Sequence, residues 1–545
     1  MKYKSILILI LITVFVNVSC TKDFEEINNN PAAFTTASDG SLFNDVINSL
    51  QSGWNEQFYI NNEILYKQTQ MAALFKEAWG NSTIGTEEIW ANYYSNLPNI
   101  RELQRRFSNA TPSAELTNMT AMVKIVLAYK TFKLTDLFGD IPYSEAGYGF
   151  QDVTKLRPKF DTQRSIYISL LEDLKWADEN INISRTGEPY ATFKGFDKLF
   201  FKYSNQLLMW RKFANSLRLR YAIRMSDKEP VLAGQIVADI INNNKPVLIG
   251  CDFSGALLEK AALYPADLGF KNEGKVWSFR EHKNLRMGSN MWKLLSSNDS
   301  ADGSGIFDAR AYMFFDSNNN GKWAPYPQIP VTGTPAESGV PYMEQRNSAG
   351  GYAVKGADCL FSPFNYFLIS DELNVPEIIM TGAEVHFLKS EAFMRGIGVS
   401  LDVFKADNEY LSGIQASLTF WKNTMSSTSL KTDGSKFDVM INVPSYLTLT
   451  YLQNKVGFWN FSNDIEKLNH IYSQQLIDFF RQPAEAFALV RRVYGKIPRE
   501  VNGSQGLLEY MRFAIPPSEV SYNQANWATA YGSQDTKQTK VWWMK

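Results

Sequence analysis

The chain has 545 residues, of which 45% are hydrophobic and 20% are charged, and its formal net charge is −1. This is the composition of a globular protein, and such a balanced charge excludes the basic surface that nucleic-acid binding requires. After the N-terminus, no apolar run approaches the roughly 18 residues of a membrane-spanning helix. Aromatic residues make up 14% of the chain, which is enough to pack helices together and also to supply a sugar-binding surface.

The N-terminus has the pattern of a lipoprotein signal peptide. Two lysines precede an apolar run at residues 6–16, and Ser19 places a small residue before Cys20. We therefore expect residues 1–19 to be removed and Cys20 to be lipidated, so that its acyl chains anchor the protein to a membrane. Ordinary secretion with an incidental Cys20 is the alternative, because Asn17 is unusual three residues before a cleavage site.

The segment that follows the cysteine is predicted to be a flexible tether. Residues 20–40 are polar, begin with an acidic stretch and cannot bury a hydrophobic core. We expect residues 41–545 to form a single domain. Within it, Cys251 and Cys359 are too few for a disulfide framework, and we predict that both are thiols.

Helical periodicity dominates residues 41–249. Apolar residues recur at helical spacing over 42–54, with Ser41 as the N-cap, and again over 64–79. Paired helices of about 15 to 20 residues with short turns favour a stacked scaffold of the tetratricopeptide type, and an irregular bundle fits the spacing equally well. The further helices predicted here are 89–103 from a Thr86 cap, 116–127 running on to Gly139, 166–177 capped by Asp161, and 207–221.

The composition of the sequence changes at residues 250–370, where Gly, Pro, Asn and Ser separate short aromatic segments. Regular helix is expected to be scarce there, and loops on a rigid scaffold commonly carry binding residues. Periodicity returns with Pro376 as a first-turn proline and continues to Gly396. The sequence thus predicts a mainly α fold, with a scaffold at 41–249 and 371–545 and a loop-rich insertion between them. Further helices are predicted at 409–421, 466–480 and 483–493.

Motifs of common catalytic sites are absent from the sequence. Its three histidines lie about a hundred residues apart, and there is no HExxH, Cys-x-x-Cys, Walker, GxSxG or GxGxxG motif. Metal-dependent hydrolysis and triad catalysis are therefore not predicted. His386 lies on an amphipathic run, where a structural role is favoured. Glycoside hydrolysis needs only two carboxylates, so a chain with 56 acidic residues retains that possibility.

One loop has the spacing of a calcium-binding site. Residues 316–321 read Asp-Ser-Asn-Asn-Asn-Gly, which matches the first half of an EF-hand loop with Asp316, Asn318 and Asn320 as oxygen ligands. The twelfth position is Pro327, where a bidentate glutamate is expected. A polar turn is therefore favoured over a structural calcium ion, and no cofactor is required.

Aromatic residues beside small polar ones are the candidate ligand contacts. Sugars pack their C–H faces on flat rings and bond their hydroxyls to polar side chains at the rim. Trp79 is followed by Gly80 and Asn81, which gives this arrangement at a helix end. Core packing is the more common role for any one such ring. The residues nominated for ligand binding are Trp79, Asn81, Trp277, Trp292, Trp323 and Tyr326.

Several longer segments form an ordered set along the chain. They are CTKDFEEINNNP (20–31), DLFGDIPYSEA (136–146), FDTQRSIYISLLED (160–173), WRKFANSLRLRYAIR (210–224), TGAEVHFLKSEAFMRG (381–396), the segment 472–495, and FAIPPSE (513–519). Together they resemble the SusD/RagB-like outer-membrane lipoproteins over essentially the whole mature chain. One departure is Gln474-Gln475-Leu476, where many relatives carry Gln-Lys-Trp.

The resemblance implies a SusD-like fold, in which tetratricopeptide-like helix pairs carry an irregular ligand-facing region. It implies an outer-membrane protein, lipid-anchored and facing the cell exterior, that binds an oligosaccharide or related nutrient and delivers it to a SusC-like TonB-dependent transporter. Such proteins bind and do not react, so no catalytic residue is carried over and no enzyme is expected. The alternatives are a secreted glycan-degrading hydrolase, a transporter subunit without ligand affinity, and a binding protein for peptides.

Overall fold

The computed structural model describes residues 37–76, 79–184, 190–250, 258–269, 273–335, 341–347, 350–356, 358–427, 431–432, 435–436 and 443–545. The predicted signal peptide, Cys20 and most of the predicted tether lie outside these ranges, as does Cys251. Lipidation and the thiol state of the two body cysteines therefore stay predictions. Among the helices in these ranges, none is both long enough and apolar enough to cross a bilayer.

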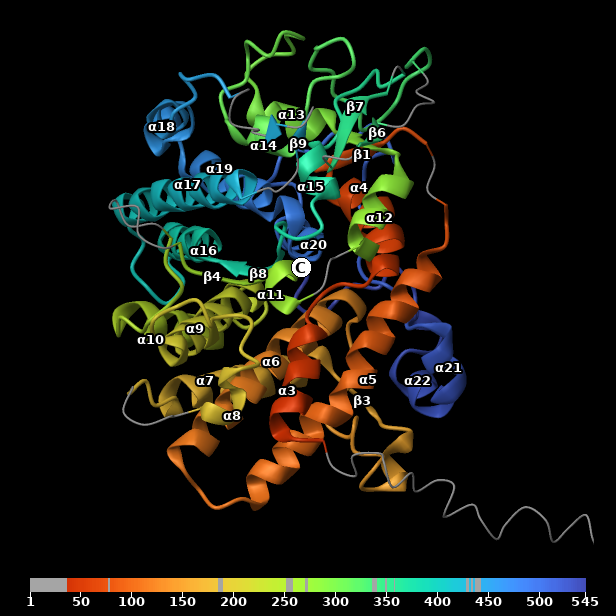
Figure 1. Ribbon diagram of the computed structural model, residues 1–545. Helices are drawn as coiled ribbons and strands as arrows, with labels where there is room; N and C mark the ends of the chain where they lie inside the picture. Colours follow the sequence, from red (N-terminus) through yellow and green to blue (C-terminus); the bar gives the residue numbers. More distant parts are fainter. Residues whose placement is uncertain are drawn as a thin grey trace, which may run out of the picture.

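Helices make up most of the described chain (Figure 1). The scaffold helices are α3 (Asp39–Asn48), α5 (Ser82–Asn109), α6 (Ala114–Phe138), α7 (Gln163–Asn180), α8 (Ala191–Lys194), α9 (Gln206–Met225), α10 (Pro230–Asn242), α16 (Gly382–Arg395), α17 (Val403–Ser426), α18 (Leu449–Val456), α19 (Asp464–Asp478), α20 (Pro483–Arg492), α21 (Pro517–Tyr522) and α22 (Gln524–Ala530). α6 packs between α5 and α7, α9 packs on α7 and α10, and α16 packs on α9 and α17. Figure 1 shows these pairs as successive layers, which confirms the predicted mainly α scaffold.

The ends of the early helices follow the local sequence. α6 begins after Ser113, whose hydroxyl accepts the backbone N–H of Leu116, and ends at Gly139 with φ of 84°, as predicted. Three predicted caps are wrong. Ser38, not Ser41, caps α3, and Thr162, not Asp161, caps α7. Thr86 lies inside α5, which begins after Asn81.

The predicted helix over 64–79 is wrong beyond residue 69. The chain forms a π-helix, η1 (Glu56–Leu65), then α4 (Tyr66–Thr69), and Gln70 takes the left-handed φ of 56° that ends the helix. The next residues form β1 (Ala72–Leu74), which pairs with β5 (Leu285–Met287) of the insertion. This pairing joins the first helices to the loop-rich region.

The predicted helix start at Pro376 is also wrong. Residues after the proline form β8 (Glu377–Thr381), which pairs with β4 (Lys260–Leu263). α16 then starts one residue later, where Thr381 Oγ1 accepts the backbone N–H of Glu384 at 3.1 Å. Its end at Gly396, in the left-handed region, is as predicted.

The insertion contains short elements, as predicted. They are α11 (Pro265–Leu268), α12 (Glu273–His282), α13 (Ser289–Leu295), α14 (Arg310–Phe314), β6 (Tyr342–Asn347), β7 (Gly350–Lys355) and α15 (Tyr366–Ser370). The remaining short elements are β2 (Ile141–Pro142), η2 (Val153–Leu156), β3 (Phe160–Asp161), β9 (Lys431–Thr432), β10 (Ser435–Lys436), η4 (Phe458–Asn460), η5 (Phe479–Arg481) and η6 (Gly532–Gln534). The strand pairs of the described chain are antiparallel and two-stranded, so helices and loops set the architecture.

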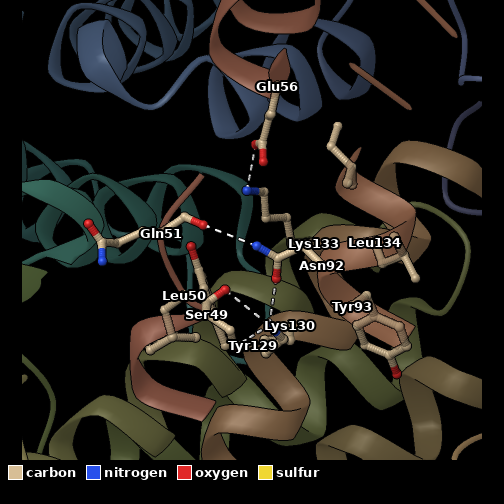
Figure 2. A pocket seen from close by; sticks show the side chains of 11 residues that line it. Ser49, Leu50, Gln51, Glu56, Asn92, Tyr93, Tyr129, Lys130, Lys133 and Leu134 are labelled. Carbon is tan, nitrogen blue, oxygen red and sulfur yellow. Dashed lines mark hydrogen bonds and ion pairs between the residues drawn. The ribbon is translucent and has the colours of Figure 1, made fainter. Parts of the chain in front are cut away.

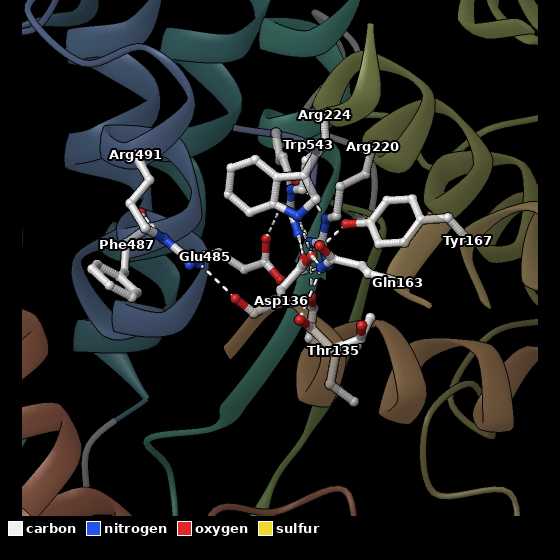
Figure 3. A network of polar contacts seen from close by, with 12 residues as sticks. Thr135, Asp136, Gln163, Tyr167, Arg220, Arg224, Glu485, Phe487, Arg491 and Trp543 are labelled. Carbon is white, nitrogen blue, oxygen red and sulfur yellow. Dashed lines mark hydrogen bonds and ion pairs between the residues drawn. The ribbon is translucent and has the colours of Figure 1, made fainter. Parts of the chain in front are cut away.

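A buried polar network joins helices that are distant in sequence (Figure 3). The guanidinium of Arg224, on α9, forms ion pairs with Asp136 on α6 and with Glu485 on α20. The indole N–H of Trp543 donates to Asp136 Oδ1 at 2.7 Å. All four side chains are buried, so the network fixes how α6, α9, α20 and the C-terminal segment meet.

Two further polar residues have structural partners. His386 lies 2.6 Å from Glu409 through Nδ1, and its Nε2 accepts the backbone N–H of Gly250 at 3.2 Å, which confirms its predicted structural role. The segment Gln474-Gln475-Leu476 departs from the sequence that many SusD/RagB-like proteins carry. The side-chain oxygen of Gln474 accepts a hydrogen bond from Arg310, and Leu476 is fully buried. The unusual residues there are accommodated in the core.

Candidate functional site

Three tryptophans expose their rings at one place on the surface, and we call them the tryptophan cluster: Trp54, Trp79 and Trp277. Their side chains are 42%, 64% and 42% exposed. The buried ring of Phe58 lies beneath them, 6.2 Å from the Trp79 ring centroid and 6.1 Å from that of Trp277. Trp54 meets Trp277 edge to face at 5.2 Å. Two nominated residues therefore come together, with Trp54 as a third member.

Two adjacent helices hold Trp54 and Trp277 in place. Figure 1 shows α12, which carries Trp277, beside the red helix that begins with Trp54 and continues as η1. The hydroxyl of Ser278 donates to the Trp54 carbonyl at 2.9 Å, and the side chain of Asn62 donates to the Ser278 carbonyl at 3.3 Å. Gly274 faces Trp54 so closely that an added Cβ would lie 3.3 Å from the Cβ of Trp54. The helices thus meet at glycine and serine, and their tryptophans point outward.

The π-helix η1 carries two residues of the site, Phe58 and Glu63. Phe58 forms the base of the cluster, and Glu63 lies one turn further on. A π-helix is rare, and short π segments occur frequently at functional sites because the wider turn redirects side chains. The C-terminal bond of this segment, from the Tyr66 N–H to the Asn61 carbonyl, spans five residues, which is the π pattern.

Glu63 fixes the backbone of the Trp79 turn. Its carboxylate accepts the N–H of Trp79 at 2.8 Å and also the N–H of Gly80. Gly80 has a φ of 77° and open space around it, so glycine allows this turn without strain. Asn81 is the residue directly before α5. Its side chain is exposed and does not accept a hydrogen bond from the first turn of the helix. The turn therefore presents one ring and one amide to solvent.

The carboxylate of Glu63 is buried beside a neutral histidine. Burial raises the pKa of Glu63, and the two backbone N–H groups oppose that rise. His282 Nε2 lies 3.8 Å from Glu63 Oε1, and burial lowers the pKa of His282 to about 3. The imidazole is therefore uncharged at neutral pH. Beneath the tryptophan cluster, the arrangement serves to hold the Trp79 turn.

A hollow of about 460 Å³ opens next to β1. Phe75 and Lys76 line it, and the chain runs from them to Trp79. Tyr326 also lines this hollow, although its ring is largely buried against Phe361 at 4.8 Å. A second hollow of about 570 Å³ is lined by residues of the 494–501 segment and α19. Both are large enough for a sugar unit.

A smaller cavity lies inside the helical scaffold (Figure 2). Its volume is about 30 Å³, the share of one water molecule in liquid water. Lys130 donates there to the Ser49 carbonyl and to Asn92, each at 3.0 Å, and Lys133 pairs with Glu56 at 2.7 Å. Burial lowers the pKa of Lys130 to about 7. This cavity is part of the core and is too small to hold a sugar.

Two nominated tryptophans are in the core, so their nomination as surface contacts is wrong. The rings of Trp292 and Trp323 stack at 5.9 Å and are only 1% and 7% exposed. Trp292 Nε1 donates to Asp299 at 3.1 Å, and Tyr312 meets Trp323 edge to face at 5.0 Å. Trp292 lies on α13 and Trp323 lies in a loop, and both take the core-packing role that is more common for such rings.

The predicted calcium loop adopts a polar turn. The side-chain oxygen of Asn318 accepts the N–H groups of Asn320 and Lys322 at 2.9 and 3.0 Å, and its amide donates to the Leu360 carbonyl at 2.8 Å. Backbone groups therefore occupy the oxygen that a cation would need. Within the described ranges, no three His, Cys, Asp or Glu side chains gather as a metal site. Calcium binding through Asp316, Asn318 and Asn320 stays a prediction that these contacts disfavour.

Comparison with known families identifies the chain. A family model described as SusD-like, "Starch-binding associating with outer membrane", matches residues 29–516. The chain belongs to the SusD-like family. No curated protein sequence matches this SusD-like chain. The match includes the insertion, the tryptophan cluster and the scaffold helices from α3 to α20.

Solved structures share the SusD-like fold at low sequence identity. A chitin-binding SusD homolog from Flavobacterium johnsoniae is 19% identical with a TM-score of 0.65, covering 93% of this chain and 98% of its own. A SusD homolog from Parabacteroides distasonis is 18% identical with a TM-score of 0.68, covering 94% and 98%. One from Bacteroides uniformis is 20% identical with a TM-score of 0.62, covering 94% and 100%. These similarities show the fold.

Proposed function

We propose that this SusD-like protein binds glycans through the tryptophan cluster at the cell surface and delivers them to a SusC-like TonB-dependent transporter. The observation that carries the proposal is the gathering of Trp54, Trp79 and Trp277 around Phe58, with their rings exposed. Exposed rings lose contact with water when a ligand covers them, and each contributes binding free energy in proportion to its covered apolar area.

The chemistry of the cluster suits sugars. Flat rings at different tilts match the C–H faces of successive sugar units, and edge-to-face contact of Trp54 with Trp277 holds two such faces at an angle of 89°. Asn81 supplies an exposed amide beside Trp79 that can bond ring hydroxyls. The family description names starch, and one related structure is of a chitin-binding protein, which supports a glycan ligand.

A polysaccharide panel tests this function. Native affinity gels and calorimetry with starch, chitin oligosaccharides and other glycans are expected to show binding to at least one member. Incubation with the same glycans is expected to release no new reducing ends, because the protein is proposed to bind and not to cleave. New reducing ends would favour the alternative of a secreted hydrolase, and peptide binding without glycan binding would contradict the ligand class.

Glu63→Ala is expected to weaken binding of the glycan that the panel identifies by about fivefold to tenfold, which corresponds to the loss of about one ordinary hydrogen bond. Without the carboxylate, the N–H groups of Trp79 and Gly80 lose their acceptor and the Trp79 ring loses its fixed position. Glu63→Gln keeps an acceptor oxygen and is expected to restore most of the affinity. Titration calorimetry measures the affinities.

A structural readout separates this positioning role from general damage. Acrylamide quenching of tryptophan fluorescence is expected to increase in Glu63→Ala but not in Glu63→Gln. The control is Glu281→Ala, which removes an exposed acid of α12 whose carboxylate lies 3.5 Å from the Lys283 ammonium. If Glu63→Ala binds as tightly as the unchanged protein, Glu63 does not position Trp79.

A further inference from the structure

The loop between β2 and β3 exposes apolar side chains at a regular spacing of three. Phe150, Val153 and Leu156 are 53%, 75% and 49% exposed. Val153 and Leu156 are the first and last residues of η2, and side chains three apart in a 3₁₀-helix lie on the same face. An added Cβ at Gly149 would touch the Leu156 side chain, so Leu156 folds back against the turn that precedes Phe150. We call these three exposed side chains the apolar ridge.

Basic residues flank the apolar ridge. Lys155 lies over the ring of Tyr148 at 5.0 Å, Arg157 lies over the ring of Tyr522 at 5.8 Å, and Lys159 is exposed. The three acids nearby are half-buried and accept hydrogen bonds from the loop's own backbone: Asp152 from Thr154, Glu145 from Lys159, and Asp161 from Tyr143 and Ser144. Arg157 and Lys159 are exposed instead, so these cations are the charges at the outer surface of the loop. Apolar side chains interleaved with cations are typical of segments that dip into an anionic lipid surface.

The loop has a rigid base at the end of the molecule from which the chain leads to Cys20. Arg101 of α5 donates to the carbonyls of Ala146 and Tyr143 at 3.1 and 2.7 Å. Five residues along the same helix, or about 7.5 Å, Arg106 donates to the carbonyl of Ala37 at 2.7 Å. Figure 1 shows this end of the molecule with β3, α21 and α22 near the start of α3.

The number of residues between Cys20 and Ala37 limits how far this end of the molecule can lie from the predicted anchor. Ala37 is 17 residues after Cys20 in the sequence, and these residues span at most about 60 Å when fully extended.

The C-terminal end of the loop between β2 and β3 is held by α22 and the residue before it. The side chains of Asn523 and Asn526 donate to the carbonyls of Pro158 and Arg157 at 2.7 and 2.9 Å. A ridge held from both sides loses little conformational entropy on binding.

We propose that the apolar ridge of Phe150, Val153 and Leu156, with Lys155, Arg157 and Lys159, docks on the anionic lipid surface that carries the Cys20 anchor. The inference rests on the outer-membrane location in the proposed function, but not on glycan binding. Docking adds a second attachment beside the lipid chains, and it orients the body on the membrane.

Vesicle flotation tests the proposal with the mature chain carrying Cys20→Ala, which has no acyl chains. It is expected to float with vesicles of phosphatidylglycerol and phosphatidylcholine, and to float less in high salt or with phosphatidylcholine alone. Combining Phe150→Ser, Val153→Ser and Leu156→Ser is expected to reduce the bound fraction at least about tenfold. Arg157→Glu with Lys159→Glu is expected to reduce it by about fivefold or more per cation.

The control replaces apolar residues elsewhere that are on average at least as exposed as those of the ridge. Val231→Ser with Phe404→Ser, at positions 73% and 75% exposed on α10 and α17, is expected to leave flotation unchanged. The ridge variant is expected to bind glycan normally, and Trp79→Ala is expected to float normally, so the two proposals fail separately. Absence of flotation by the Cys20→Ala chain overturns lipid docking, as does a ridge variant that floats normally but loses an outer-membrane protein partner.

Discussion

Arg224→Leu is expected to lower the free energy of unfolding by about 3–5 kcal/mol, the largest stability effect that we predict. The substitution leaves Asp136 and Glu485 buried without the guanidinium that bridges them (Figure 3). Tyr167 and Trp543 still donate to Asp136, and Arg220 still lies 3.4 Å from Glu485, but neutral donors and one long ion pair do not replace the lost guanidinium. The midpoint of chemical denaturation and the thermal unfolding temperature measure the change.

The loss in Arg224→Leu is expected to depend on pH in a defined direction. Burial already raises the pKa of Asp136 against the opposing charge of Arg224, so loss of the guanidinium is expected to raise the folded-state pKa of Asp136 further. Burial also opposes the lowering of the Glu485 pKa by Arg220 and Arg224, and this lowering is expected to weaken. The folded variant then binds more protons than the unfolded chain, so its stability falls as pH rises. The deficit against the unchanged protein is therefore expected to be smaller at pH 5 than at pH 8.

Two further variants make this result interpretable. Arg224→Lys keeps the charge but not the two-pronged geometry, and is expected to lose less stability than Arg224→Leu. Arg164→Leu breaks the Arg164–Glu229 pair, in which Arg164 is 53% exposed, and is expected to cost less than about 1 kcal/mol. Equal losses from Arg164→Leu and Arg224→Leu would show that burial of the network does not determine its contribution.

Trp79→Ala and Trp277→Ala are each expected to weaken glycan binding by about fivefold to thirtyfold, and the double variant by about a hundredfold or more. Each substitution removes an indole ring that a bound sugar would cover, and burial of that apolar area contributes about 1–2 kcal/mol to the binding free energy. Calorimetry with the glycan that the panel identifies measures these affinities. Because both residues are substantially exposed, folding and thermal stability are expected to remain close to those of the unchanged protein.

Trp459→Ala is the matched control for the tryptophan variants. Its ring is 59% exposed and follows α18, which Figure 1 shows on the opposite side of the molecule from α12. The control is expected to bind as the unchanged protein does. If Trp79→Ala and Trp277→Ala also bind normally, the tryptophan cluster is not the glycan site.

Local signals predicted the helical scaffold well. Gly139 and Gly396 end their helices as expected, since the left-handed region favours glycine. The strands β1 and β8 were missed because their partners, β5 and β4, are more than a hundred residues away along the chain. Short strands paired over such distances leave no periodicity to detect in a single sequence.

The candidate site was predicted in part. Trp79 and Trp277 were nominated because of their aromatic character and polar neighbours, and the structure brings them together. Trp54 was missed because its spacing placed it on the apolar face of an expected helix over 42–54, whereas α3 ends at Asn48. Glu63 leaves no sequence signal, because its role depends on a turn that is brought back beside η1.

The buried network also constrains the time at which the protein can fold. Asp136 and Arg224 are made in the first half of the chain, but Glu485 and Trp543 complete their surroundings only near the end of synthesis. Until then, the early helices hold charges that they cannot bury without cost. The core around Asp136 and Arg224 can therefore close only after the C-terminal segment has been made, so the early helices depend on the last residues of the chain for their final packing.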